Sequence, residues 1–446
     1  DGSTLTVTAG ASSAMKLDAN SRISLSNNDS GGTGGADSTS GNTLMGYLAG
    51  EDIASGGINN TLIGHGAGKN ITTSDYNVAI GQDSLKSIVG GGEQNTSVGS
   101  LSGDALITGD ANVFMGVGAG GATEDVDNTT IIGYAAGQGV MDNNADGTVA
   151  VGYASLQSLT SGARNVAVGF QSLQDMTAGV DNVMIGYNAG LDANHADFSY
   201  NVGLGSYVFD GAGAVGAGYN TAMGYAAMSG VLTADADFNT AIGHNALNGL
   251  TSGDNNVALG SGAGGALSTG HRNIMIGKQA GDAMTTEDDC VLIGYNAGIA
   301  LTHTNSNGSV AIGSGALGVL ESGRANVAIG YQALDAEDDG DFNTAVGYQA
   351  LTAQTGTSGT IKNTAIGYQS GLAITKGRYN TIIGAGALAS EDIGDETVAI
   401  GVDALGSQNS DQDNEVTANV AVGKDTGYHN VLGKNNTYLG HKAGQG

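Results

Sequence analysis

The chain has 446 residues, of which 79 are glycine, none is proline or tryptophan, and one, Cys290, is cysteine. Its formal net charge of −29 disfavours binding to nucleic acid or insertion at an anionic membrane surface, because both carry the same sign of charge. No run of about 20 apolar residues is present, so the sequence predicts no membrane-spanning helix. The single cysteine excludes an intramolecular disulfide framework.

Residues 1–41 are interpreted as an N-terminal lead-in of short strands that caps the fold, and residues 42–446 as a repeat region. A glycine recurs throughout this region after segments such as NVALG (256–260) and NTAVG (343–347). It is called the anchor glycine below, and positions are counted from it. There are 23 copies, from Gly46 to Gly440, most of them 17 residues apart and the others 18 to 22. Such self-similarity is typical of solenoids.

Each position around the anchor glycine has a restricted composition. Position −1 is always Ile, Val, Leu or Met, and position −3 is always Val, Thr or Ile. These two positions lie on one face of a strand, and β-branched residues suit a pleated surface. Position −4 is Asn in 18 copies, and stacked Asn side chains can bond one another in a ladder. Position +1 is Tyr in nine copies, which predicts rings stacked from repeat to repeat.

A 17-residue unit with two short strand arms and two turns cannot fold alone and must stack on its neighbours. The sequence therefore predicts an all-β fold, a parallel β-solenoid of about 23 repeats of about 17 residues and on the order of 110 Å long. The absence of proline fits, since each rung needs its backbone N–H groups for the next. The following residues are predicted to form the structural ladder: Asn256, Val257, Leu259, Gly260, Asn273, Ile276, Gly277, Asn326, Ile329, Gly330, Asn343, Val346 and Gly347.

The units NTAVGYQAL (343–351), NTAIGYQSG (363–371) and NVAIGYQAL (326–334) resemble the N-T-A-x-G-x-x-A-L repeat of bacteriophage tail fibres. They are also similar to the head repeat of trimeric autotransporter adhesins. MKLDANSRISLSNNDSGG (15–32) resembles the lead-in of phage-type fibres. The resemblance implies a parallel homotrimer of β-rolls or an interwound triple β-helix, located on a virion surface or outside the cell, with a cell-surface glycan or protein receptor as partner.

Several local patterns point to chemistry, and each has a simpler explanation within the repeat. The stretch GSGAGG (260–265) fits the dinucleotide-binding pattern G-x-G-x-x-G, but the next segment is another repeat rather than a helix. The acidic groups at 287–289, 335–341 and 411–415 do not complete a calcium loop. His65, His244 and His441 are far apart along the rod, and three copies of one would have to meet at a trimer axis to bind a metal. No catalytic residue, cofactor site or metal site is predicted.

The longer repeats predict loops that bulge from one face of the solenoid, which is often the binding face. The alternative is neutral drift in repeat length. The candidate loops are residues 191–200, 301–309 and 351–362. The candidate binding residues in them are Asn194, His195, His303, Asn305, Gln354 and Thr357.

The leading hypothesis is a non-enzymatic fibre shaft of a virion tail that presents receptor-binding surfaces. A bacterial surface or extracellular adhesin is the alternative. A third hypothesis is a glycan depolymerase, which would need paired carboxylates in a groove. A fourth is an ice-binding solenoid, which would need a flat Thr ladder. At position −3 Thr alternates with Val, as though the column were buried, and this disfavours the fourth hypothesis.

Overall fold

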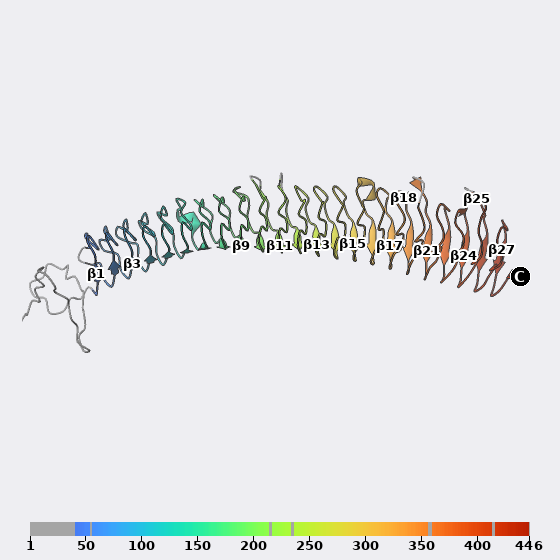
Figure 1. The fold of residues 1–446 in the computed structure, drawn as a ribbon, viewed down its shortest axis with the longest axis horizontal. Helices are drawn as coiled ribbons and strands as arrows, with labels where there is room; N and C mark the ends of the chain where they lie inside the picture. The colour runs from blue at the N-terminus through green and yellow to red at the C-terminus, as the bar shows by residue number, and fades with distance from the viewer. Residues whose placement is uncertain are drawn as a thin grey trace, which may run out of the picture.

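The computed structural model of the chain describes residues 41–53, 56–213, 216–232, 236–355, 359–412 and 415–445. These residues coil into a slightly curved rod of stacked rungs, with the N-terminal rungs at one end and the C-terminal rungs at the other (Figure 1). The predicted lead-in lies outside the described residues, apart from Gly41.

One sheet runs along the whole rod. Its 23 strands all pair in parallel with the strand of the next rung, and the register aligns every anchor glycine with the one before it. The predicted parallel β-solenoid with about 17 residues per turn is therefore confirmed. The strands are β1 (Thr43–Met45), β2 (Thr61–Ile63), β3 (Val78–Ile80), β4 (Thr96–Val98), β5 (Val113–Met115), β6 (Thr130–Ile132), β7 (Val149–Val151), β8 (Val166–Val168), β9 (Val183–Ile185), β10 (Val202–Leu204), β11 (Thr221–Met223), β12 (Thr240–Ile242), β13 (Val257–Leu259), β14 (Ile274–Ile276), β15 (Val291–Ile293), β16 (Val310–Ile312), β17 (Val327–Ile329), β19 (Thr344–Val346), β21 (Thr364–Ile366), β22 (Thr381–Ile383), β24 (Val398–Ile400), β26 (Val420–Val422) and β27 (Thr437–Leu439).

The expectation of two strand arms in every rung is wrong. Most described rungs contain a single strand, and the rest of the rung turns through residues with positive φ, such as Asn255 (58°) and Leu247 (49°). A second, short sheet forms at two places, where β18 (Gly340–Asp341) pairs with β20 (Gly359–Thr360) and β23 (Gly394–Asp395) pairs with β25 (Glu415–Val416). Two 3-10 turns, η1 (Asn143–Ala145) and η2 (Thr304–Ser306), lie away from the long sheet (Figure 1).

The interior of the rod is filled by the middle residue of each strand and by small or aliphatic residues of the turns. Ala258 in β13 is fully buried, whereas its neighbours Val257 and Leu259 are 36% and 43% exposed. The expectation that the Val and Thr column is buried is therefore wrong: positions −3 and −1 share a face, as predicted, but that face points outward. The middle residue faces inward whatever its size: it is alanine in many rungs, but Phe114 and Met184 occupy the same position and are also fully buried.

The burial of the column at position −3 was the argument against an ice-binding solenoid, and that argument no longer holds. The ice-binding hypothesis is nevertheless still disfavoured. Position −1, the second column on the outward face, carries only Ile, Val, Leu or Met. The outward face is consequently a mixed aliphatic and threonine surface rather than a regular threonine array.

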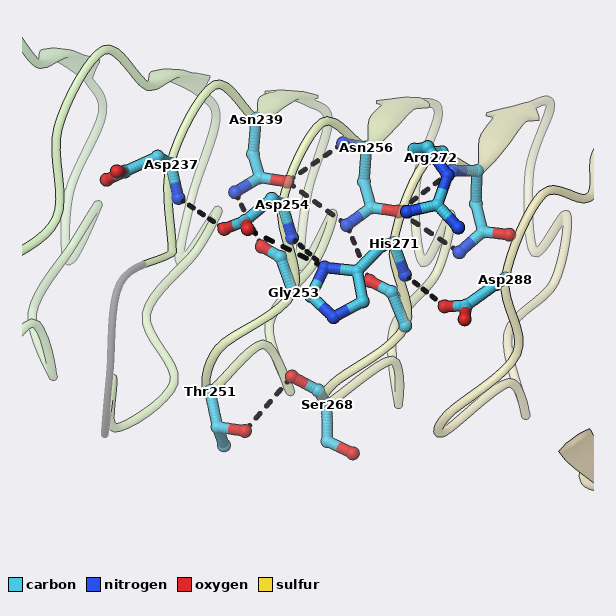
Figure 2. A network of polar contacts seen from close by, with 12 residues as sticks. Asp237, Asn239, Thr251, Gly253, Asp254, Asn256, Ser268, His271, Arg272 and Asp288 are labelled. Carbon is cyan, nitrogen blue, oxygen red and sulfur yellow. Dashed lines mark hydrogen bonds and ion pairs between the residues drawn. The ribbon is translucent and has the colours of Figure 1, made fainter.

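Stacked asparagines hold one corner of the rungs together. Asn256 is fully buried and its Nδ2 donates to Asn239 Oδ1 (3.1 Å) and to the Gly270 carbonyl (2.8 Å). Its Oδ1 accepts from the Asn273 backbone N–H (3.0 Å) and from Asn273 Nδ2 (3.1 Å). Figure 2 shows this ladder passing from rung to rung. The predicted asparagine ladder is confirmed, and it satisfies backbone groups that the three-residue strands leave unpaired.

A second ladder, two residues before the asparagines, lies nearer the surface. The Asp237 backbone N–H donates to Asp254 Oδ1 (3.0 Å), the Asp254 N–H to His271 Nδ1 (3.0 Å), and the His271 N–H to Asp288 Oδ1 (2.7 Å) (Figure 2). Each side chain thus caps a backbone donor of the rung before it. Much of the acidic surplus in the turns therefore has a structural role.

Candidate functional site

The outward face of the long sheet, formed by positions −3 and −1, exposes aliphatic side chains along the rod. Within the described residues it includes large exposed side chains in rungs from one end to the other, such as Met45, Met115, Met223, Ile329 and Leu439, which are 36–77% exposed. Monomeric proteins rarely expose contiguous apolar patches larger than a few hundred Å². This surface is called the sheet face below.

Beside the sheet face, position +1 forms a column of aromatic rings, as predicted. Tyr134, Tyr153, Phe170 and Tyr187 stack face to face, with ring centroids 5.6, 4.9 and 5.1 Å apart. A second stack, which the sequence analysis missed, lies at position −5 and contains Tyr200, Tyr219 and Phe238, with centroids 4.7 and 5.0 Å apart. The missed signal was an aromatic residue directly before the asparagine in consecutive repeats.

Two rungs that carry the G-x-G-x-x-G pattern line hollows in the surface. Gly260–Gly265 lines a hollow of about 470 Å³ between His244 and Lys278, and Gly313–Gly318 lines one of about 500 Å³ between Tyr295 and Tyr331. In both rungs position +1 is serine and position +2 is glycine, so side chains are missing where neighbouring rungs carry larger ones. The glycine pattern marks a notch in the column rather than a phosphate-binding turn.

The predicted binding residues do not converge on one site. Asn194 and His303 are exposed, and His195 and Asn305 are half-buried. The two loops are six rungs apart, about 29 Å at a rung spacing of about 4.8 Å. Both histidines cap local turns, since His195 Nδ1 accepts from the Asp197 N–H (3.1 Å) and His303 Nδ1 from the Asn305 N–H (3.1 Å).

The prediction that Gln354 lines a binding loop is wrong. Gln354 is fully buried; it donates to the carboxylate of the equally buried Glu337 and accepts from Asn363 Nδ2 (2.9 Å). Glu337 and Gln354 occupy the interior column that most other rungs fill with Leu, Ile or Met, so the amide is needed as a partner for the carboxylate. Thr357 lies outside the described residues.

An equivalent pair, Glu391 and Gln408, lies three rungs further on (2.9 Å). Glu391 Oε1 also accepts from the Gly394 N–H (2.8 Å), as Glu337 Oε1 does from Gly340 (2.7 Å). Both carboxylates precede the first strand of one of the short second sheets, so each fixes the turn that leads into that sheet.

One acidic group has ligand atoms close enough to share a cation. The carboxylates of Glu337, Asp338 and Asp339 lie within 4.8 Å of one another. However, Glu337 faces the interior and is committed to Gly340 and Gln354. The group therefore has a structural explanation.

The single cysteine occupies position −4 in place of asparagine. Cys290 is fully buried, and its thiol donates to the Ser306 carbonyl (Sγ–O 3.4 Å). Burial raises the pKa of Cys290 to about 12. The thiol is consequently neutral at physiological pH, which fits the predicted role as a small, inert core residue.

Carboxyl groups give the rod an unusual expected pH dependence. Burial raises the pKa of Asp104, Asp175, Asp210, Asp335 and Glu337 above their ordinary values. A group whose pKa is raised in the folded state binds its proton more tightly there than in the unfolded chain. The stability from that protonation is present at low pH and is lost as pH rises through the folded pKa.

We therefore expect the thermal unfolding midpoint to fall as pH rises from about 4, the ordinary pKa of these carboxyl groups, toward 8. Two aspartates act in the opposite sense, because ion pairs with Arg164 and Arg272 lower the pKa of Asp181 and Asp289. Their contribution is lost only below about pH 4. Scanning calorimetry from pH 4 to 8 checks this, and a midpoint that rises steadily toward pH 8 would contradict it.

Within the described residues, no helix has the length and apolar character needed to cross a bilayer. Neither a protein-family model nor a curated protein matches the chain. The fold defines the class: this is a β-solenoid repeat protein.

Proposed function

We propose that the chain is the shaft of a trimeric, non-enzymatic fibre, borne on a virion tail, that holds receptor-binding surfaces away from the particle. The observation that carries the proposal is the sheet face, where aliphatic side chains are exposed in rungs from one end of the described rod to the other. The resemblance of the repeats to those of phage tail fibres supports a virion as the source of the fibre and three as its number of chains.

The size of the sheet face supports self-association. The 22 rung steps span about 105 Å and a three-residue strand is about 10 Å wide, so the face covers about 1,000 Å². A stable protein interface buries about 800 Å² per partner. Another copy of the same chain, parallel and in register, offers an apolar face of equal length and equal spacing.

Acidic residues on the sheet face are expected to separate the chains without unfolding them. In the double variant Leu259→Glu and Ile329→Glu, the new carboxylates replace side chains that are 43% and 36% exposed. The stability of the single rod is therefore expected to change little. Assembly would place like charges in an apolar interface, and we expect the oligomer to dissociate at micromolar concentration.

The matched control for this experiment is Val89→Glu, since Val89 is 48% exposed but lies between β3 and β4, outside the strands that form the sheet face. Sedimentation velocity distinguishes the variants. If the double variant keeps the mass of the parent protein, the sheet face is not the interface.

The mechanical role follows from the bonding pattern. Each rung is joined to the next by strand hydrogen bonds, and many rungs are also joined by the asparagine ladder and by the second ladder nearer the surface. Force or a protease must open many bonds of one rung together to interrupt such a rod. A bacterial surface adhesin would use the same architecture. Negative-stain images of purified virions labelled with an antibody to the chain distinguish a virion fibre from a bacterial adhesin.

The positions of the interior carboxylates support the non-enzymatic proposal. Glu337 and Glu391 are fully buried and accept backbone N–H groups, so they are not poised to act on a glycan in a groove. Incubation of purified chain with host surface polysaccharide tests this directly. Release of oligosaccharides would favour the depolymerase hypothesis instead.

A further inference from the structure

The tyrosine column is interrupted by a serine between two tyrosines at two places, and the two places differ in one informative way. At Ser206, between Tyr187 and Tyr225, the gap is filled by the next residue of the same chain. The Tyr207 ring lies 5.4 Å from the Tyr187 ring and 5.5 Å from the Tyr225 ring, inclined by 62° and 67°. A six-membered ring therefore fits between tyrosines that are two rungs apart, and it is steeply inclined to both.

At Ser314, between Tyr295 and Tyr331, the same gap is open. The residue equivalent to Tyr207 is Gly315, and the space is part of the hollow of about 500 Å³. Two rung spacings of about 4.8 Å separate the tyrosines. That distance accommodates a ring in van der Waals contact, at about 4 Å, with both faces. The gap between Tyr295 and Tyr331 is called the slot below.

On each tyrosine ring, the face that points away from the slot already has a neighbour. Lys278 Nζ lies 5.8 Å from the centroid of Tyr295, and the Tyr348 ring stacks 5.2 Å from Tyr331. The faces left without an aromatic or cationic neighbour are the two that border the slot. Tyr295 and Tyr331 are 52% and 46% exposed.

The rim of the slot is polar. Asn296, Gln332, Asp335 and Ser314 line the hollow, and Gln332 Nε2 donates to Asp335 Oδ2 (3.1 Å), which holds the carboxylate in place. Amide, hydroxyl and carboxylate groups recognise hydroxyls, while the negative faces of aromatic rings attract polarised C–H groups. A pyranose carries C–H bonds on its faces and hydroxyls around its edge, so it matches both parts.

We propose that the slot binds one hexopyranose unit of a surface glycan, between Tyr295 and Tyr331. The proposal rests on the proposed fibre function and names the receptor chemistry of one site on it. The sugar is neutral or cationic rather than acidic, because Asp335 lines the slot and the chain carries a net charge of −29. The hollow at Gly262 is a poorer candidate, since His244 and Lys278 replace the two tyrosines there.

The decisive variant places in the slot the same residue type that fills the equivalent gap at Ser206. Gly315→Tyr recreates the Ser206–Tyr207 sequence at a residue with a similar backbone, since φ is 68° at Gly315 and 59° at Tyr207. A Cβ on Gly315 has no neighbour closer than 3.5 Å, so the substitution fits. Gly262→Tyr is the matched control: it fills the other hollow from the same position of the repeat, where φ is again 68°.

A second variant, Tyr331→Ser, removes one wall and uses a residue that this column already contains at Ser261. The probes are the methyl pyranosides of glucose, galactose, mannose and N-acetylglucosamine, with glucuronic acid and N-acetylneuraminic acid as acidic comparators. Saturation-transfer NMR detects binding to the full chain, and titration measures its affinity.

We expect at least one neutral pyranoside to bind, and both Gly315→Tyr and Tyr331→Ser to weaken that binding by about tenfold or more, while Gly262→Tyr leaves it unchanged. Absence of binding by every neutral pyranoside, or equal binding by Gly315→Tyr, would overturn the proposal. Sedimentation of the same samples distinguishes failure of the slot proposal from failure of the fibre proposal. If the trimer persists without sugar binding, only the slot is refuted; if the chain is a monomer that binds sugar, only the fibre is.

Discussion

Replacing Gly260 with alanine is expected to destabilise the rod strongly, by about 3 kcal/mol or more. Gly260 has φ of 140°, a conformation that side-chain-bearing residues rarely adopt, and an added Cβ would lie 2.5 Å from the Gly277 carbonyl oxygen. The clash is with backbone rather than with a side chain, and the Gly277 N–H is bonded to the Leu259 carbonyl (2.8 Å), so a rotamer change cannot relieve it. Urea unfolding of parent and variant measures the loss.

The control for this substitution lies two residues further on. Gly262 also has positive φ (68°), but its nearest contact for an added Cβ is Asp282 Oδ1 at 3.4 Å. Other rungs carry Ala135 or Asn245 at this position with similar φ. Gly262→Ala is therefore expected to cost about 1 kcal/mol. Equal losses for the two variants would show that the anchor glycine has no special role in rung stacking.

The second large effect is expected at the asparagine ladder. Asn256→Ala removes two donated and two accepted hydrogen bonds inside the rod, and leaves the Gly270 carbonyl and the Asn273 N–H without these partners. Each buried polar group left unpaired costs about 1–3 kcal/mol, so a total of about 3–5 kcal/mol is expected.

Two further substitutions at Asn256 distinguish hydrogen bonding from simple packing. Asn256→Asp keeps the shape but cannot donate to Asn239 and Gly270, so it should be at least as damaging as alanine. Asn256→Thr should be milder, because Thr129, Thr148 and Thr397 occupy this position in other rungs. Thermal unfolding of the three variants gives the order, and an aspartate variant as stable as the parent would contradict the ladder.

The repeat itself could be predicted from the sequence because its constraint is local and recurs in every rung. Gly260 aligns with 22 other glycines, and that register alone implies stacking. The direction of the strand faces could not be predicted from the pattern. Val257 and Leu259 alternate with Ala258, and apolar character favours the larger pair inside, but in the fold the middle residue of the strand faces inward, whether it is Ala258 or Phe114.

The candidate sites were harder to predict because they depend on neighbouring rungs. Gln354 looks like a polar loop residue until Glu337, 17 residues earlier, is seen to share its interior column. The slot likewise depends on three residues, Tyr295, Ser314 and Tyr331, that occupy position +1 in three consecutive rungs. Comparing positions +1 and +2 between adjacent copies would have found it, since Tyr207 and Gly315 occupy the same position in the repeat.

The mass of the purified full chain in solution tests the fibre proposal most directly. Sedimentation equilibrium at micromolar concentration should give three times the chain mass of 43.9 kDa, with the frictional ratio of a rod about 105 Å long. A stable species of 43.9 kDa, with the sheet face exposed to solvent, would contradict the proposal that this solenoid is built to associate along its length.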